Sequence, residues 1–234
     1  MPDLVHHRDI QGGVARAGVF GASDGLVTNV SLILGVAGAN PGVGIVRLAG
    51  LAGLVAGAFS MAAGEYVSMK AQSELFEREL ALERKELELH PEGERKELAH
   101  IYESRGVDPA LAHQMAHAMM KDTDMALEVH AREELGIDPQ NLGSPWKAAS
   151  SSFVAFSLGA LLPLIPWFFM HGSSAVVASV IIGALASFSI GAALSTFTGK
   201  SLIFSALRQV GISAIAGGIT YGVGALVGVG TSPT

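Results

Sequence analysis

LAGLAGLVAGAFSMAAGEYVSMKAQSELFERELALERKELEL, residues 48–89, decides the fold of this chain. Its first half consists of small and apolar residues, and its second half is rich in Glu, Lys and Arg. No Gly or Pro occurs between Glu65 and His90, so nothing in the sequence ends a helix there. At 1.5 Å per residue the stretch predicts one helix about 60 Å long, twice the thickness of a bilayer core. We therefore expect a helix that crosses a membrane and continues into water as an acidic arm.

The composition agrees with a membrane protein that carries one polar insertion. Charged residues make up 15% of the chain, against about 25% in ordinary soluble domains, and the mean hydropathy is +0.43. All but four of the acidic residues lie between Glu74 and Asp138. The net charge of −6 argues against nucleic acid as a partner. The absence of cysteine excludes disulfides and thiolate metal ligands.

Five segments rich in Gly and Ala are long and apolar enough to cross a bilayer. They are residues 14–38, 48–69, 148–170, 174–197 and 202–229. Between the second and third segments, three short helices are predicted at residues 94–104, 110–121 and 123–135. The third segment contains Pro163 and Pro166, which a membrane helix tolerates when neighbouring groups satisfy the freed carbonyls.

The expected fold class is an all-α membrane protein. It has five transmembrane helices and a cytoplasmic three-helix metal-binding insertion after an extended second helix. We expect residues 1–72 to hold the first two spans, residues 73–144 the acidic helical domain, and residues 145–234 the last three spans.

The distribution of basic residues predicts the orientation. Arg8 and Arg16 precede the first span, and Lys200 and Arg208 lie around the connection between the fourth and fifth spans. Only Arg47 lies at the opposite side. Because cytoplasmic loops are enriched in Lys and Arg, the N-terminus and the acidic domain are expected in the cytoplasm. The short loops suit the plasma membrane of a bacterium, which is the location we expect.

Asp24 and Glu65 are the two acidic residues in the predicted spans. An ionisable side chain at membrane depth is costly and usually serves an ion or proton path. Met61 precedes Glu65 by four residues and shares its helix face, where a thioether and a carboxylate suit a borderline divalent ion such as Fe²⁺. Two plainer interpretations remain open. Each carboxylate can be a structural group that is hydrogen-bonded to a neighbouring helix, and Met61 can simply fill a packing gap.

The acidic insertion contains a second set of candidate metal ligands. Its glutamates form two pairs with three-residue spacing, one at the end of the long helix and one after the Pro91–Gly93 turn. If that turn folds the helices back, the pairs face each other as in di-iron bundles. The candidate ligands are Glu83, Glu86, Glu94, Glu97, His130 and Glu134. The same spacing also fits solvated faces with Glu–Lys and Glu–Arg pairs.

Several motifs together carry a resemblance to a known family. They are FGASDGLVTNVSLILGVAGA (20–39), SMAAGEYVSMKAQ (60–72), ELGID (134–138), FSLGALLPLIPW (156–167) and GGITYGVG (217–224). With these motifs the chain resembles the vacuolar iron transporter family and looks like a bacterial type of member. The resemblance implies a homodimer whose subunits have five transmembrane helices and a cytoplasmic metal-binding domain. It also implies export of Fe²⁺, sometimes Mn²⁺, from the cytosol in exchange for protons.

The resemblance assigns roles to individual residues. The family's pore aspartate and pore methionine match Asp24 and Met61, and its cytoplasmic glutamates match Glu83, Glu86, Glu94, Glu97 and Glu134. Two positions depart from the pattern of the plant members. Gly53 stands where those members have an acid, and His130 and Ala131 stand where they have paired methionines. Glu65 is a candidate to replace the missing pore acid, and His130 a missing methionine, because imidazole also binds iron.

The sequence thus predicts a transporter and not an enzyme. The expected partners are divalent metal ions, protons, membrane lipid and a second copy of the chain. Fe²⁺ or Mn²⁺ is expected as cargo, with no permanently bound cofactor. One alternative is a membrane-anchored metal sensor or sequestration protein that does not transport. Another is a ferroxidase-like enzyme that uses the glutamates as a di-iron centre.

Overall fold

The long helix predicted from residues 48–89 is the dominant element of the structure. The computed structural model describes residues 13–230, and within that range every regular element is helical. Helix α2 runs without interruption from Val43 to Leu89 over 47 residues. The other elements are α1 (Gly13–Gly38), α3 (Pro91–Ser104), α4 (Pro109–Met119), α5 (Thr123–Glu133), α6 (Pro145–Leu161), the 3₁₀ helix η1 (Leu162–Leu164), α7 (Pro166–Phe169), α8 (Gly172–Thr198) and α9 (Leu202–Gly230).

Five of these helical segments are long and apolar enough to cross a membrane. They comprise α1, α2, α6 with η1, α8 and α9. This confirms the prediction of an all-α protein with five apolar spans. Arg8 and the N-terminal residues used to predict the orientation lie outside the described residues.

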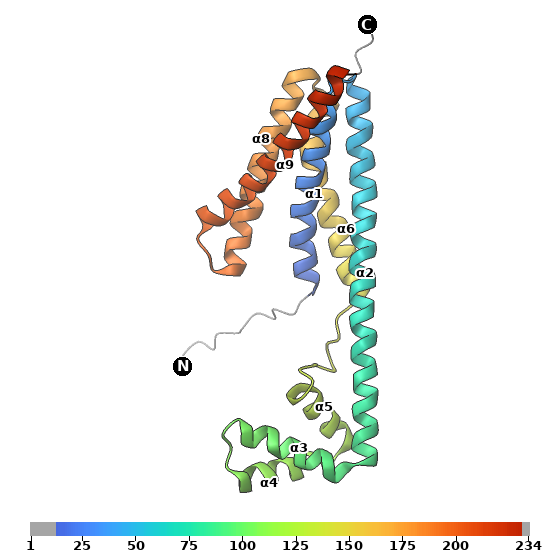
Figure 1. Cartoon of the computed structure of the whole chain (residues 1–234), viewed down its shortest axis with the longest axis vertical. Coiled ribbons are helices and arrows are strands. Elements are labelled where there is room, and N and C mark those ends of the chain that lie inside the picture. The colour runs from blue at the N-terminus through green and yellow to red at the C-terminus, as the bar shows by residue number, and fades with distance from the viewer. Residues whose placement is uncertain (1–12, 231–234) are drawn as a thin grey trace. The chain divides into compact units, whose positions relative to one another are not determined.

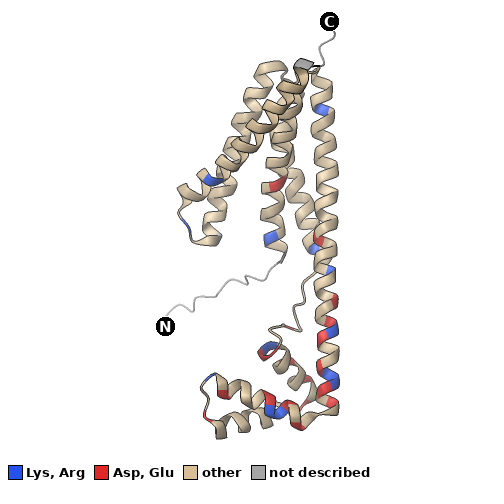
Figure 2. Ribbon diagram, in the orientation of Figure 1, with Lys and Arg blue, Asp and Glu red and all other residues tan. Residues whose placement is uncertain are grey.

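The chain divides into two compact units, each of which contains part of α2. One unit comprises the described residues up to Val67 together with those from Pro145 onward, and the other comprises Ser68–Ser144. Acidic and basic residues gather on α3–α5 and on the later turns of α2, whereas α1, α6, α8 and α9 carry few (Figure 2).

In the first unit, α1 packs against α6, α8 and α9 (Figure 1). Small residues allow this packing. A Cβ atom on Gly159 of α6 would overlap the Ala22 carbonyl oxygen of α1, so these two backbones are in direct contact. An apolar cluster at one end of the unit contains Ile33, Val46, Leu164 and Trp167, all buried.

The third span is not one helix, and its prolines are the reason. Pro163 and Pro166 lack the N–H that would continue the α-helical pattern, and the segment divides into α6, η1 and α7. Side chains from other helices bind the carbonyls around this break. Asn29 Nδ2 of α1 donates to the Ala160 carbonyl at 2.6 Å, and Ser179 Oγ of α8 donates to the Pro163 carbonyl at 2.7 Å.

Arg47 of α2 completes the set of side chains around the break. Its Nε donates to the Trp167 carbonyl at 2.6 Å, and its guanidinium lies 5.7 Å from the centre of the Phe168 ring. Side chains from three helices therefore bind carbonyls in and after the break, as irregular backbone in a membrane protein requires.

The second unit holds α3, α4 and α5 beside the last turns of α2. Asp108 caps α4 by accepting hydrogen bonds from the Ala110 and Leu111 N–H groups, and Asp122 caps α5 by accepting from Met125 N–H. Helix α3 begins at Pro91, three residues before the predicted start, because proline is well tolerated at the first helical position. The core of this unit consists of Leu98, Ala99, Tyr102, Ala112 and Ala116.

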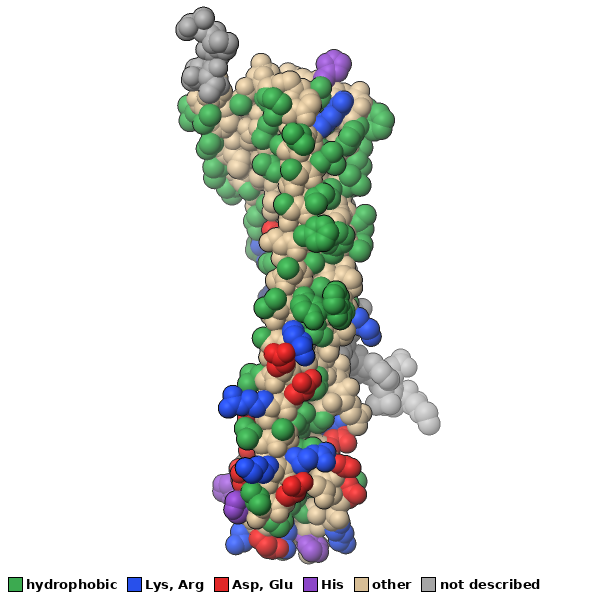
Figure 3. Space-filling model, turned by 90° about the vertical axis from the view of Figure 1, so that its right-hand side faces the viewer, with side chains coloured by type: hydrophobic (Ala, Val, Ile, Leu, Met, Phe, Trp, Pro, Cys, Tyr) green, Lys and Arg blue, Asp and Glu red, His purple; other side chains and the backbone are tan. Residues whose placement is uncertain are grey.

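One side of α2 is apolar and exposed along its membrane-length part. Side chains that face outward there include Ile45, Leu48, Val55 and Phe59, with exposed fractions of 57%, 68%, 51% and 63%. Figure 3 shows hydrophobic side chains gathered over this face of the unit.

Candidate metal centre and membrane carboxylates

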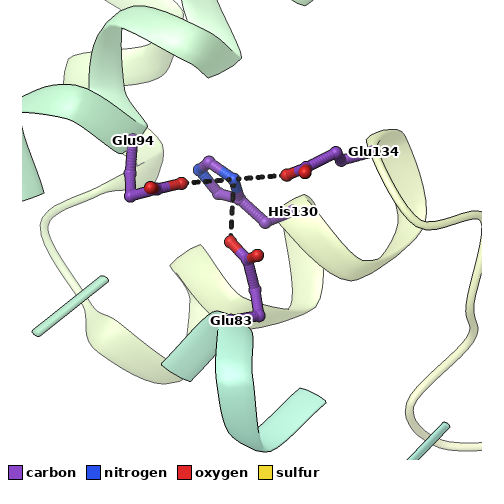
Figure 4. A group of neighbouring side chains, drawn as sticks. All are labelled: Glu83, Glu94, His130 and Glu134. Carbon is purple, nitrogen blue, oxygen red and sulfur yellow. Dashed lines mark ion pairs between the residues drawn. The ribbon is translucent and has the colours of Figure 1, made fainter. Parts of the chain in front are cut away.

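Three helices of the second unit bring four candidate ligands together. Glu83 comes from α2, Glu94 from the first turn of α3, His130 from α5, and Glu134 from the C-terminal cap of α5 (Figure 4). The fold positions them through its packing. Leu87 of α2 is buried against the apolar face of α5, and His130 shares that buried side of α5. Helix α3 starts directly after His90, so its first turn stays close to the end of α2.

The three carboxylates converge on one nitrogen atom of His130. His130 Nδ1 lies 3.2 Å from Glu83 Oε1, 3.6 Å from Glu94 Oε2 and 3.5 Å from Glu134 Oε2. One ligand atom from each residue can be chosen so that all four lie within 4.8 Å of one another. Ligand atoms bound at about 2.1 Å lie about 3.0–3.4 Å apart along the edges of an octahedron or a tetrahedron. The observed separations from His130 Nδ1 match those edges to within a few tenths of an ångström.

The cluster is partly buried: Glu134 is exposed at its edge, and three polar atoms of the two buried members lack a hydrogen-bond partner in the described part of the chain. The His130 side chain is fully buried, and those of Glu83 and Glu94 are only 9% and 12% exposed. Neither ring nitrogen of His130 forms a hydrogen bond with the described part of the chain, and neither does Glu83 Oε1. Buried polar atoms are normally paired, since an unpaired one costs about 1–3 kcal/mol. A divalent cation among these atoms would supply the missing partner.

The electrostatics of the cluster also favour a cation. Burial, and then the negative charges of Glu134, Glu94, Glu97 and Glu86, raise the pKa of Glu83 to about 7. Burial likewise raises the pKa of Glu94, although the nearby His130 opposes that shift. These carboxylates are held close together in a poorly solvated place, where each disfavours the charge of the others. Binding of a positive ion would relieve both effects.

Glu86 and Glu97 lie outside the four-residue cluster. Glu86 is exposed, and its Oε2 lies 2.8 Å from His90 Nδ1. Glu97 is exposed on α3. Both residues act on the cluster through their charge, because each raises the pKa of Glu83. Of the six candidate ligands in the acidic insertion, the structure therefore brings four into contact and leaves two beside them.

The candidate pore residues are spread along α1 and α2. Asp24 is exposed on α1, and Thr28 Oγ1 of the same helix donates to its Oδ1 at 3.3 Å. Met61 is half-buried beside Ala58, Phe156 and Ala160, so it does contribute to packing. No ion pair or hydrogen bond joins Asp24 to α2 among residues 13–230.

Glu65 has a partner that was not predicted from the sequence. Its Oε2 lies 3.6 Å from Nη2 of Arg16 on α1, and its side chain is 14% exposed. In the sequence, Arg16 served only as one of the cations that predict the orientation. Because the pair joins two different helices, no spacing pattern in the sequence predicts it.

Gly53 and Asn29 face each other across α1 and α2. A Cβ atom on Gly53 would lie 3.0 Å from Asn29 Oδ1 and would overlap the end of the Leu32 side chain. Asn29 Oδ1 is buried and forms no hydrogen bond with the described residues. Where α2 has Gly53, the nearby polar group is thus the uncharged Asn29 amide of α1. A search of the sequence for charged residues does not find it.

Comparison with known proteins places the chain in a family. The protein called vacuolar iron transporter 1 of Arabidopsis thaliana is 35% identical over 225 residues, covering 93% of this chain and 89% of the relative. The vacuolar iron transporter of Acanthamoeba castellanii is 40% identical over 220 residues, covering 92% and 78%. That of Toxoplasma gondii is 31% identical over 236 residues, covering 95% and 77%. A family model described as the VIT family matches residues 15–225. This integral membrane protein, with its five apolar helices and its cluster of three glutamates around a buried histidine, belongs to the VIT family.

Proposed function

We propose that this protein exports Fe²⁺ from the cytosol across the membrane in exchange for protons, and that it also accepts Mn²⁺. The observation that carries the proposal is the cluster of Glu83, Glu94, His130 and Glu134, whose spacing and unsatisfied polar atoms suit one divalent cation. The names of the relatives, all vacuolar iron transporters, support iron as the cargo.

The cytoplasmic unit captures the ion in this proposal. The charges of Glu86 and Glu97 attract cations to the cluster, whose ligands are carboxylates and one imidazole. Carboxylates suit Mn²⁺, imidazole suits Fe²⁺, and a mixed set accepts both. The orientation with the N-terminus and this unit in the cytoplasm, here that of a bacterial plasma membrane, follows from Arg16, Lys200 and Arg208.

The ion then crosses the membrane along Glu65, Met61 and Asp24. An ionised carboxylate in a lipid-facing position costs about 2.5–3.5 kcal/mol on insertion scales, yet Asp24 is exposed on the isolated protomer. We infer that a second protomer covers Asp24 and the outward apolar face of α2, so that the pore lies within a homodimer. Asp24 binds the metal ion while it is ionised, and it releases the ion when a proton from the opposite side neutralises it.

The test is metal uptake into proteoliposomes under an imposed pH gradient. Wild-type protein should move Fe²⁺ and Mn²⁺ in a gradient-dependent manner. Asp24→Asn keeps the side-chain volume and should abolish the flux, whereas Glu88→Gln, an exposed acid of α2 outside the cluster, should not change it.

Each alternative has its own signature in the same preparation. Undiminished flux in Asp24→Asn would refute the role of Asp24. Tight metal binding without flux would favour the sensor or sequestration protein. Oxidation of added Fe²⁺ in air, seen as a rise in ferric absorbance, would favour the ferroxidase-like enzyme.

A further inference from the structure

The ion pair between Arg16 and Glu65 has no assigned part in transport. Arg16 lies in the first turn of α1, and Glu65 lies on α2 in the same compact unit. Arg16 Nη2 and Glu65 Oε2 are 3.6 Å apart, which is an ion pair but not a hydrogen bond. Glu65 Oε2 is buried and forms no hydrogen bond with residues 13–230. A largely desolvated carboxylate is therefore balanced by a charge that holds it only loosely.

The two partners differ strongly in exposure. The Glu65 side chain is 14% exposed, whereas that of Arg16 is 69% exposed. The guanidinium can leave the carboxylate and enter water or the headgroup region without moving the backbone. The carboxylate has less freedom, because its Oε2 atom is buried. An arriving cation can thus replace Arg16 at Glu65. In the described part of the chain, Arg16 has no other carboxylate partner.

The pair lies on the same side of α1 as Asp24. Arg16, Phe20 and Asp24 follow one another at four-residue intervals on one face of α1. Helix α2 runs antiparallel to α1, and the contact of Gly53 with Asn29 fixes their register. In this register Met61 falls at the level of Phe20.

Along α1 and α2 the order of levels is therefore Arg16 with Glu65, then Phe20 with Met61, then Asp24. Arg16 and Asp24 are separated by two turns of α1, about 12 Å. An ion that enters from the N-terminal end of α1 meets the Arg16–Glu65 pair before it meets Met61 or Asp24.

We propose that Arg16 is an exchangeable counter-ion that sets the metal concentration at which Glu65 loads the pore. A divalent cation binds Glu65 by displacing the guanidinium, and the guanidinium returns when the ion moves on to Met61 and Asp24. The doubly charged ion gains more from the carboxylate than the singly charged arginine does, whereas a monovalent ion has no such advantage. Arginine stays protonated at every physiological pH, so this exchange is separate from proton coupling. The inference rests on the proposed transport function.

The experiment compares four full-length variants in proteoliposomes. Arg16→Gln removes the competing charge, and Arg16→Lys keeps it. Glu65→Gln removes the carboxylate, and the double variant removes both charges, so that no unpaired charge is left. Fe²⁺ and Mn²⁺ are the probes, and the readouts are the half-saturating metal concentration and the maximal flux. Size-exclusion profiles and helical circular dichroism check that each variant is folded.

The expected result is a change in apparent affinity that depends on Glu65. Arg16→Gln should lower the half-saturating concentration about tenfold, which corresponds to about 1.4 kcal/mol, while Arg16→Lys should resemble the wild type. In the Glu65→Gln background the further change at residue 16 should have no effect. A purely structural pair would instead lower the maximal flux of both single variants equally.

The outcomes separate this inference from the proposed function. If wild-type protein carries metal, Asp24→Asn abolishes the flux, and Arg16→Gln leaves the half-saturating concentration unchanged, the counter-ion role is wrong and transport stands. An effect of Arg16→Gln that persists in the Glu65→Gln background would also overturn it. If wild-type protein carries no metal, the proposed function fails, and this inference fails with it.

Discussion

Replacing Glu83 with glutamine should stabilise the metal-free second unit, Ser68–Ser144, at neutral and alkaline pH. The folded-state pKa of Glu83 is about 7, raised from 4.5 chiefly by burial. A carboxyl group whose pKa is raised on folding favours the folded state fully only below pH 4.5, and this contribution is lost as the pH rises through 7. Because a tenfold change in an equilibrium constant is worth about 1.4 kcal/mol, the ionised side chain destabilises the folded unit above pH 7 by about 3 kcal/mol. At pH 5 this destabilisation is less than about 1 kcal/mol.

Amide hydrogen exchange in the full-length protein measures this difference. Peptides from α3 and α5 report the free energy of local opening in the presence of a chelator. At pH 8 the Glu83→Gln protein should exchange more slowly than the wild type by up to about a hundredfold, which corresponds to about 3 kcal/mol. At pH 5 the two proteins should be nearly equal. Comparing them at one pH removes the pH dependence of intrinsic exchange.

A matched control and a metal titration complete the test. Glu88→Gln removes an exposed carboxylate from the same helix and should leave exchange in α3 and α5 unchanged. Added Mn²⁺ should slow exchange in the wild type far more than in Glu83→Gln, because the variant lacks one ligand. Equal or faster exchange of metal-free Glu83→Gln at pH 8 would refute the conclusion that the cluster holds like charges together in a buried place.

Two further predictions concern the metal centre and the broken third span. The metal affinity of the cluster should rise about tenfold per pH unit below pH 7 and level off above it, since Glu83 must lose its proton to bind metal. Calorimetric Mn²⁺ titrations at pH 6, 7 and 8 measure this dependence. An affinity that does not change with pH would contradict it. Asn29→Ala leaves the buried Ala160 carbonyl without its hydrogen bond and should destabilise the detergent-solubilised protein by about 1–3 kcal/mol in thermal unfolding. Ser189→Ala removes an exposed hydroxyl that bonds only within α8, so it should change the thermal stability little. Equal melting temperatures of the two variants would show that Asn29 does not support the break.

Much of the fold follows directly from local sequence signals. The uninterrupted α2 follows from the absence of Gly and Pro between Glu65 and His90. The starts of α4 and α5 follow from the capping residues Asp108 and Asp122. These features depend on neighbours in sequence, so one chain is enough to predict them. The division of the third span was not predicted, because it depends on whether Asn29 and other distant side chains bind the freed carbonyls.

The candidate site was predictable in composition but not in geometry. Three-residue spacing places Glu83 and Glu86 near one helix face, and it does the same for Glu94 and Glu97. Which member of each pair turns inward depends on the direction in which α3 leaves the end of α2, and spacing does not contain that information. The pairing of Arg16 with Glu65 joins two different helices and was likewise inaccessible to a periodicity argument.

The proline break has a mechanical consequence for the membrane unit. Asn29, Arg47 and Ser179 tie three separate helices to the carbonyls of one irregular segment through hydrogen bonds of 2.6–2.7 Å. A rotation of any one helix there would break bonds that no water in the bilayer core could replace. We therefore expect this end of the unit to act as a fixed pivot during transport. At the N-terminal end of α1, Arg16 and Glu65 join α1 to α2 through an ion pair of 3.6 Å. The two helices can therefore separate there with little loss of bonding. Distances between spin labels on α1 and α2 should accordingly be widely distributed at the N-terminal end of α1 and narrowly distributed beside Pro163 and Pro166.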